Sequence, residues 1–174
     1  MNIDSLMIDE ISELYKSVGW TNYTKDTARL ARAFEQSESL IKRNGEGKII
    51  GIVRWITDFA TIAFIQDILI HPRYQRQGIG KVLLNEALEK ITSYGPVQIE
   101  LLTDDTEKTK KFYESVGFVQ VKEMGGISYV IDTRRKKVLF GNDKLAGYDV
   151  YYEEKSMNSR EDFIEGIKES VKEA

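Results

Sequence analysis

Apolar side chains recur every three or four positions in four segments of the chain, which is the spacing of one face of a helix. The first segment predicts an amphipathic helix over residues 8–18. The second predicts a helix that begins near Thr24, whose hydroxyl is suited to capping it. Two later helices are predicted, one from about Gly80 and one over residues 106–116.

Apolar runs between turn-forming residues predict the strands. The second and third runs flank a short polar turn and are expected to form a hairpin of buried strands. The last two are expected to form another hairpin, around Gly125 and Gly126. The strands predicted in this way cover residues 39–43, 48–57, 61–70, 96–102, 118–121 and 127–131.

The predicted order is helix, helix, three strands, helix, strand, helix and two strands. This order is typical of the α/β class, with a mixed, mostly antiparallel sheet and flanking helices. Residues 1–132 are expected to form one domain. Residues 133–174 are expected to form an extension of short strands and an amphipathic helix. The apolar stripe of that helix, from Phe163 to Val171, must cover either the core or another subunit, so a homodimer is a hypothesis.

Composition excludes several kinds of site. The 174 residues include no cysteine and one histidine, His71, so disulfides, thiolate metal ligands, a cysteine acyl-enzyme and a multi-histidine metal centre are excluded, and we expect no metal. The net charge of −3 gives no reason to expect a nucleic-acid partner. No apolar run is long enough for a membrane span, and the first residues lack the basic start of a signal peptide. We therefore expect a cytoplasmic protein with no membrane partner.

The segment between the strand at 61–70 and the helix from Gly80 has the chemistry of an anion site. The first amides of a helix have no partner within it, and glycine lets a phosphate approach them closely. The spacing fits neither the Walker loop nor the dinucleotide fingerprint, whose third small residue is replaced here by Leu83. From these residues alone, a phosphate loop and a plain strand–helix turn both remain open. The loop consists of Gln75, Arg76, Gln77, Gly78, Ile79 and Gly80, with Lys81 adding charge.

Two motifs together resemble one family. The pattern Gln75-x-x-Gly78-x-Gly80 after an apolar strand resembles the acyl-CoA pyrophosphate loop of the GCN5-related N-acetyltransferases (GNAT), Q/R-x-x-G-x-G/A. Residues 112–118, FYESVGF, resemble the second landmark of the family, FYxxxGF. The resemblance covers roughly residues 8–132 and is strongest to the small-amine, arylalkylamine-like members.

This resemblance implies a GNAT-like sheet with a splayed central strand pair. It also implies an N-acetyltransferase that moves an acetyl group from acetyl-CoA to the primary amine of a small molecule. With no cysteine to carry the acetyl group, we expect direct attack in a ternary complex.

The resemblance also assigns roles to particular residues. The loop from Gln75 to Lys81 would bind the cofactor pyrophosphate, and the amides of Ile68, Leu69 and Ile70 would face the pantetheine arm. Tyr113 would protonate the leaving thiolate. Thr106 stands where the family often has asparagine, so it either replaces a cofactor contact or only caps the helix.

Asp67 interrupts an otherwise apolar strand, AFIQDILI. A carboxylate is costly to bury without a partner or a task. We therefore expect Asp67 to act as a base or to anchor the amine, unless it is a hydrogen-bonded structural residue. Trp20 and Tyr23 lie where the family has a substrate wall, and core packing is the alternative.

Two other functions remain open. The same catalyst could act on a protein lysine or N-terminus. Alternatively, the chain could be a non-catalytic acyl-CoA-binding module whose C-terminal segment mediates association.

Overall fold

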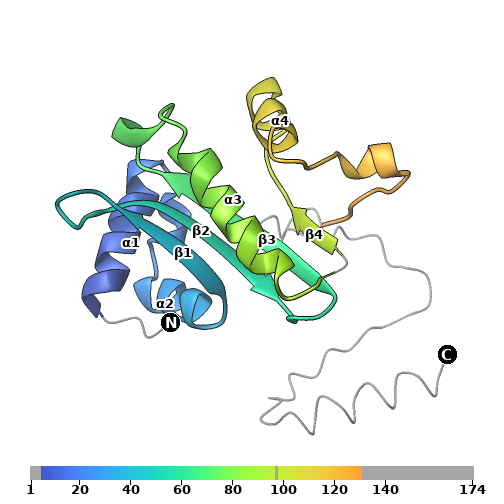
Figure 1. Cartoon of the computed structure of the whole chain (residues 1–174). Coiled ribbons are helices and arrows are strands. Elements are labelled where there is room, and N and C mark those ends of the chain that lie inside the picture. The colour runs from blue at the N-terminus through green and yellow to red at the C-terminus, as the bar shows by residue number, and fades with distance from the viewer. Residues whose placement is uncertain (1–4, 97, 131–174) are drawn as a thin grey trace, which may run out of the picture. The chain divides into compact units, whose positions relative to one another are not determined.

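The computed structural model describes residues 5–96 and 98–130 (Figure 1). The chain divides into two compact units, Met1–Ile127 and Ser128–Ala174, and every element below belongs to the first. Its sheet has the order β1-β2-β3-β4, with β1 (Glu38–Arg43), β2 (Ile49–Thr57), β3 (Ile62–Ile70) and β4 (Gln98–Leu101). The first three strands are antiparallel, and β4 is parallel to β3. The predicted mixed α/β sheet is confirmed.

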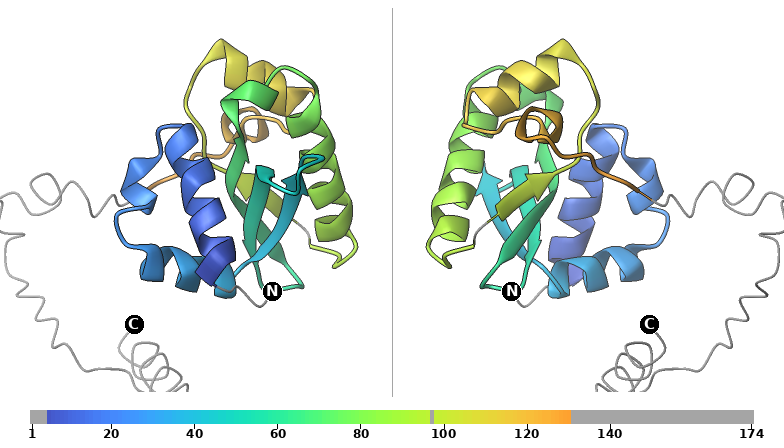
Figure 2. Two further views of the ribbon diagram at one scale, coloured as in Figure 1. Left: turned by 90° about the vertical axis from the view of Figure 1, so that its left-hand side faces the viewer. Right: turned by 90° about the vertical axis from the view of Figure 1, so that its right-hand side faces the viewer.

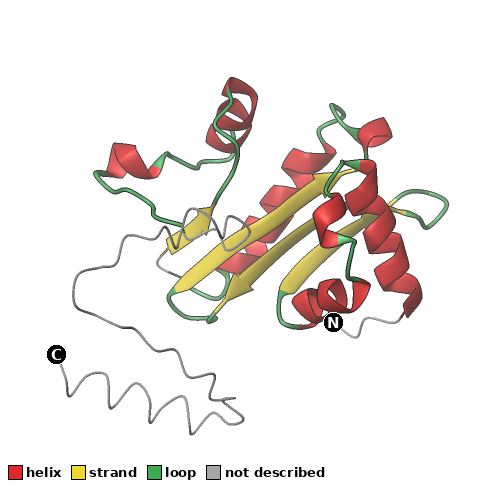
Figure 3. Cartoon of the chain, turned by 180° about the vertical axis from the view of Figure 1, so that it is seen from behind, coloured by secondary structure: helices red, strands yellow, loops and turns green. Residues whose placement is uncertain are grey.

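Helices cover both faces of this sheet (Figure 2). Helices α1 (Ser5–Ser17) and α2 (Thr27–Glu35) pack on one face, and their buried side chains form a core with Ile52 and Leu69. Helix α3 (Ile79–Thr92) connects β3 to β4 and forms a second core on the other face with Val53 and Ile65. Figure 3, seen from behind, shows the strands in front of α3. Helix α4 (Glu107–Glu114) follows β4.

A β-bulge divides β3 into two halves. Arg54 of β2 lies opposite Asp67, whereas the next residue, Trp55, lies opposite Ile65, so Gln66 has no partner on β2. An extra residue reverses the alternation of side chains along a strand. Ile65 therefore belongs to the core under α3, while two residues later Asp67 faces α1 and α2.

Strand β4 accompanies only the first half of β3. Their parallel pairing runs from Ile62 with Gln98 to Ile65 with Leu101 and then stops. Beyond the bulge β3 continues to Ile70 with no strand on that edge among the residues that the structure describes. The central pair is thus splayed, and the splay begins at the bulge.

Two local predictions were wrong. Helix α2 is capped by Asp26, whose carboxylate accepts a hydrogen bond from the Arg29 amide, while Thr24 ends the short 3-10 helix η1 (Thr21–Tyr23). An aspartate directly before the first turn outcompetes a threonine two residues further away. Residues 118–120, predicted as part of the first strand of the last hairpin, are not a strand. The 3-10 helix η3 (Val121–Met124) follows them and ends at Gly125 with a φ of 78°. Residues 126–130 are not a strand either.

The remaining predictions on the C-terminal extension fall on residues 131–174, outside the described part. The amphipathic helix around Phe163 and the homodimer that rests on it stay predictions. Among the described helices, none combines the length and the apolar character that a membrane crossing needs.

Candidate functional site

A cavity of about 310 Å³ lies where β3 continues beyond β4. We call it the main cavity. One wall is the outer half of β3, and the others are the loop before α3, the first turn of α3 and one face of α4. Its lining residues are Ile68, Ile70, Gln75, Arg76, Gly78, Gly80, Lys81, Lys108, Thr109, Phe112 and Tyr113.

The loop before α3 is held in an unusual backbone conformation. The 3-10 helix η2 (Pro72–Tyr74) begins the loop, and Arg76 and Gly78 then both have positive φ, 62° and 80°. Positive φ is uncommon for a residue with a Cβ and indicates strain at Arg76. The Gln75 side chain secures the loop to the strand by donating to the Ile70 carbonyl at 2.9 Å. The loop is therefore anchored to β3 at its start and ends in the free amides of α3.

The two glycines leave room beside this backbone. A Cβ on Gly78, the residue that caps α3, would have no atom within 4 Å, so the space beside its Cα is open. A Cβ on Gly80 would meet Ile70 at 3.4 Å and the Phe112 ring at 3.8 Å. Glycine at position 80 thus lets β3, α3 and α4 converge on the cavity. The amides of the first turn of α3, with the partial positive charge of the helix end, fit a phosphate there.

Backbone amides on the β3 wall point into the splay. The His71 amide donates to the Ile50 carbonyl at 2.8 Å, and hydrogen-bonded pairs alternate along an antiparallel ladder. This alternation turns the amide of Leu69 towards β2 and the amides of Ile68 and Ile70 away from it. Of the three amides that were predicted to face the pantetheine arm, those of Ile68 and Ile70 thus lie on the splayed edge, and that of Leu69 does not. Leu69 is in the core under α1 and α2.

The side chain of Ile70 is supported from behind by Gly51 of β2. A Cβ at Gly51 would lie 2.7 Å from Ile70 Cδ1 and 3.3 Å from Leu83. Glycine at this position lets Ile70 lie against the sheet.

Three cations surround the cavity: Arg76, Lys81 and Lys108. In the part of the chain that the structure describes, none of them belongs to an ion pair, so their charge is available to an anion. Sequence reasoning missed Lys108 and Thr109. Both share a helix face with Phe112 and Tyr113, since they precede them by four positions, and this spacing could have identified them.

Tyr113 lines the same cavity from α4. Its ring packs edge-on against Phe112 and Phe118, at centroid distances of 5.0 and 5.9 Å. Burial raises the pKa of Tyr113 above its usual value, and a hydrogen bond with the Thr103 hydroxyl partly lowers it. The phenol therefore stays protonated at neutral pH and can act as a proton donor.

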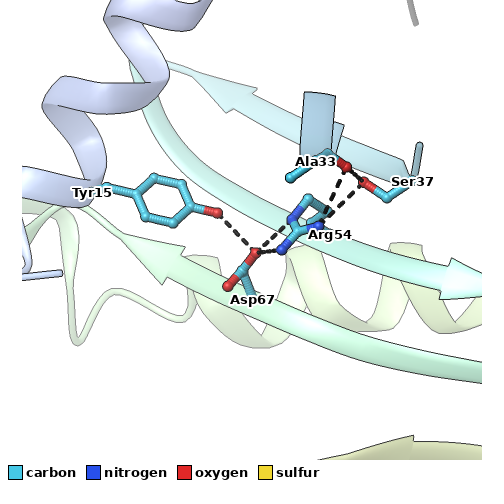
Figure 4. Close-up of polar contacts among 5 residues, drawn as sticks. All are labelled: Tyr15, Ala33, Ser37, Arg54 and Asp67. Carbon is cyan, nitrogen blue, oxygen red and sulfur yellow. Dashed lines mark hydrogen bonds and ion pairs between the residues drawn. The ribbon is translucent and has the colours of Figure 1, made fainter. Parts of the chain in front are cut away.

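Asp67 lies on the opposite face of the sheet. Its Oδ2 is 2.5 Å from both Nε and Nη2 of Arg54, and it accepts a hydrogen bond from the Tyr15 hydroxyl at 2.8 Å (Figure 4). The residue is 1 % exposed and does not line the main cavity. Because the bulge at Gln66 reverses the alternation of β3, the structure does not bring Asp67 to the place where a base or an amine anchor was predicted.

Besides Leu69, three further predicted cofactor residues lie outside the cavity lining. The Thr106 hydroxyl accepts from the Thr109 amide at 3.2 Å and completes a capping box, so it serves as a helix cap. Gln77 and Ile79 line a separate depression between the start of α3 and Lys42 of β1.

Trp20 and Tyr23 lie on the face of the sheet that carries Asp67. Their rings are stacked at a centroid distance of 5.7 Å, and Tyr23 also packs on Tyr15 at 5.5 Å. Both are partly exposed, 39 % and 37 %, so they form a small aromatic surface above the buried polar cluster.

Comparison with known proteins gives consistent matches. The sequence profile described as "Acetyltransferase (GNAT) domain" matches residues 10–130. An uncharacterized N-acetyltransferase, ycf52, of Gracilaria tenuistipitata var. liui is 27 % identical over 114 residues, which are 64 % of this chain and 62 % of that protein. Histone acetyltransferase TAP1 of Glycine max is 31 % identical over 120 residues, 63 % of this chain and 50 % of that protein. The chain thus spans between half and two thirds of the length of these relatives.

A solved structure gives the same result. A GNAT family acetyltransferase from Streptococcus pneumoniae TIGR4 superimposes with a TM-score of 0.65 and 32 % identity, covering 77 % of this chain and 95 % of that one.

The predicted cytoplasmic location is contradicted by the plant relatives. Three Arabidopsis thaliana proteins of similar sequence are named chloroplastic and point to the plastid; one of them is 28 % identical over 118 residues, 66 % of this chain and 48 % of that protein. A cysteine-free domain of modest charge is compatible with either compartment, so composition could not separate them.

Proposed function

Because the chain belongs to the GNAT acetyltransferase family, we propose that it transfers an acetyl group from acetyl-CoA to the primary amine of a small molecule by direct attack in a ternary complex. One observation carries the proposal. The main cavity brings together a glycine loop at a helix N-terminus, two outward-facing strand amides and a protonated tyrosine.

The residues that line the cavity fit acetyl-CoA. Gly78, whose backbone has a positive φ, and the first amides of α3 suit its pyrophosphate. The positive charge that balances it comes from Arg76, Lys81 and Lys108. The amides of Ile68 and Ile70 would bind the pantetheine arm and the thioester oxygen along the free edge of β3. When bound, acetyl-CoA supplies an activated acetyl group and a thiolate leaving group.

Each remaining chemical task falls to a group of this chain. The Ile68 and Ile70 amides are fixed donors, and preorganised donors stabilise negative charge that develops on an acyl oxygen. Tyr113 donates its proton to the departing sulfur as the C–S bond breaks. Its raised pKa keeps that proton in place across the neutral range.

The amine must reach the thioester without its extra proton. No carboxylate is among the residues that line the main cavity, and Asp67 is turned to the other face and paired with Arg54. We therefore assign the removal of this proton to water. The rate should then rise with pH as the neutral fraction of the amine rises.

The resemblance of the two motifs to small-amine members supports a small amine as acceptor. The stacked, partly exposed rings of Trp20 and Tyr23 do not line the main cavity and lie on the other face of the sheet. A protein or peptide amine is the second candidate, favoured by the likeness to the soybean histone acetyltransferase. A parallel screen of arylalkylamines, polyamines and lysine peptides distinguishes the two acceptor classes.

The experiment that tests the function is the Tyr113→Phe variant. We expect kcat for thiol release to fall by about 10²- to 10⁴-fold, the usual contribution of a positioned acid, with acetyl-CoA affinity unchanged in calorimetry. Tyr74→Phe is the matched control, since the Tyr74 hydroxyl contacts Asn44 away from the cavity. Wild-type protein that binds acetyl-CoA but turns over no amine would instead identify a binding module.

A further inference from the structure

The ion pair between Arg54 and Asp67 lies at the bulge of β3. The two residues are register partners across β2 and β3, and the unpaired Gln66 is next to Asp67. Their side chains are 6 % and 0 % exposed. The pair therefore joins the two strands at the point where the alternation of β3 reverses.

Contacts from both neighbouring helices hold the pair (Figure 4). Tyr15 of α1 donates to the Asp67 carboxylate at 2.8 Å. Arg54 Nη1 reaches the Ala33 carbonyl of α2 and the Ser37 hydroxyl that follows it, each at 3.5 Å. Figure 4 shows these contacts converging from α1, α2 and the two strands. The register of β3 is thereby tied to the helices.

Stability alone does not explain this cluster. Removing two charges from water is unfavourable, and well-packed apolar residues in place of a buried ion pair are often neutral or stabilising. Here, moreover, the buried Oδ1 of Asp67 has no hydrogen-bond partner among the described residues. A buried polar cluster of this kind is better suited to specifying one strand register among several.

Two arrangements of β3 compete. Without the bulge, strict alternation from Ile65 would place Asp67 under α3 and would turn Ile68 and Ile70 to the face of α1 and α2. In that arrangement Asp67 would lose Arg54 and Tyr15, its two partners. An unpaired buried carboxylate is strongly unfavourable, so the cluster excludes the unbulged register.

We propose that Arg54, Asp67 and Tyr15 are positioning residues that lock the bulged register of β3 and so keep the amides of Ile68 and Ile70 directed at the acyl donor. The proposal rests on the proposed function for the use of these amides. The register itself can be tested without it.

The test is the double variant Arg54→Met/Asp67→Leu, which keeps the core filled while removing the lock. Hα–Hα contacts in NMR spectra report the register, because the pairs Gly51–Ile70 and Val53–Ile68 are the close, non-hydrogen-bonded ones. In wild-type protein we expect both contacts. In the variant we expect a population in which Val53 instead contacts residue 67.

Ligand affinities test the consequence for binding. Acetyl-CoA needs the loop and the strand amides, whereas 3′,5′-ADP, its nucleotide fragment, needs only the loop and the cations. Losing two hydrogen bonds predicts a fall of about tenfold or more in acetyl-CoA affinity, with 3′,5′-ADP affinity kept within about twofold. A merely structural loss would lower both affinities together.

The matched control is a second ion pair beside a second register shift. Arg43 Nη1 lies 2.5 Å from Glu10 Oε2, and the pairing of β1 with β2 shifts between Lys42 and Arg43. This pair is partly exposed and lies on β1, two strands away from the splayed edge of β3. Glu10→Gln/Arg43→Gln should leave the β3 contacts and both affinities unchanged.

Wild-type contacts and wild-type acetyl-CoA affinity in the double variant would overturn the proposal. Should that variant fail to fold, Tyr15→Phe decides, since it removes one hydrogen bond and no charge. A smaller selective loss of acetyl-CoA affinity then supports the lock, and no loss refutes it. If wild-type protein binds neither ligand, the proposed function fails, while the NMR contacts of the double or the single variant still decide the register.

Discussion

On the α1 and α2 face of β3, Arg54 and Asp67 are buried and neutralise each other. On the α3 face, Arg76, Lys81 and Lys108 surround an open cavity and belong to none of the ion pairs among the described residues. The two faces are the two sides of the same strand, β3. The paired charges stabilise one arrangement of the fold, and the cations without an ion-pair partner are available to a ligand.

This difference gives a criterion for identifying functional charged residues: whether the charge has an ion-pair partner within the fold. A buried charge with a partner on the neighbouring strand specifies structure, even where its burial makes it conspicuous in the sequence. Cations without partners beside a glycine loop are available to an anion. The predictions below probe this contrast, from the largest expected effect to the smallest.

Asp67→Ala removes the partner of a buried guanidinium. Because this leaves Arg54 buried and unpaired, we expect the free energy of unfolding to fall by about 3–5 kcal/mol. Denaturant unfolding measures the change. Glu13→Ala, which breaks the exposed pair with Lys16, is the control and should have little effect. If the free energy of unfolding falls by similar amounts in the two variants, the buried pair contributes no more to stability than the exposed pair.

Gly78→Ala tests the cavity face. Gly78 and Gly47 have nearly the same positive φ, 80° and 81°, and a Cβ at either would meet no atom within 4 Å. Both Gly→Ala variants should therefore lose the same stability, about 1–2 kcal/mol. Only Gly78→Ala should weaken acetyl-CoA, by about tenfold or more, because its Cβ keeps a phosphate from the backbone. If calorimetry gives equal acetyl-CoA affinities for the two variants, the loop before α3 does not bind the cofactor.

The pH dependence of stability in the Tyr15→Phe variant tests the role of the Tyr15 hydroxyl on the buried face. Burial raises the pKa of Tyr15 well above its usual range, and the Asp67 carboxylate raises it further. Above pH ~10 the unfolded chain releases this proton while the folded chain keeps it, so stability falls as pH rises, by up to about 1.4 kcal/mol per pH unit. The variant should lose less stability between neutral and strongly alkaline pH. Parallel curves for the two proteins would contradict this assignment.

Lys108→Ala is expected to have the smallest effect. Its exposed charge should contribute about threefold to acetyl-CoA affinity at low salt, and salt should screen the difference. Lys110→Ala is the control on the same helix, since Lys110 pairs with Glu114 and does not line the cavity. A larger effect of Lys110 than of Lys108 would place the anion elsewhere.

Much of this architecture was predictable because it depends on local patterns. Apolar runs marked β2 and β3, helical spacing marked α1 and α3, and the glycines identified the loop before α3. Tyr113 could be found because the loop and the FYxxxGF motif occur together in one family.

The side of the sheet on which Asp67 lies was not predictable, because one unpaired residue decides it. Nothing in AFIQDILI marks Gln66 as the extra residue; it becomes extra only when β2 and β3 pair. The last hairpin was also predicted wrongly, since residues 118–120 form no strand and residues 121–124 form a 3-10 helix. At Gln66, pairing between distant segments overrides local preference.

Ile70 lies between Gly51 and the cavity, and this arrangement has a consequence for how the site can change in evolution. A methyl group at position 51 would meet the tip of Ile70 at 2.7 Å, so that side chain would have to move. The shape of the main cavity at Ile70 thus depends on β2, a strand that contributes no residue to the cavity lining. Exchange of glycine for alanine at this hidden position would alter the cavity at Ile70 while every residue that lines the cavity stayed the same.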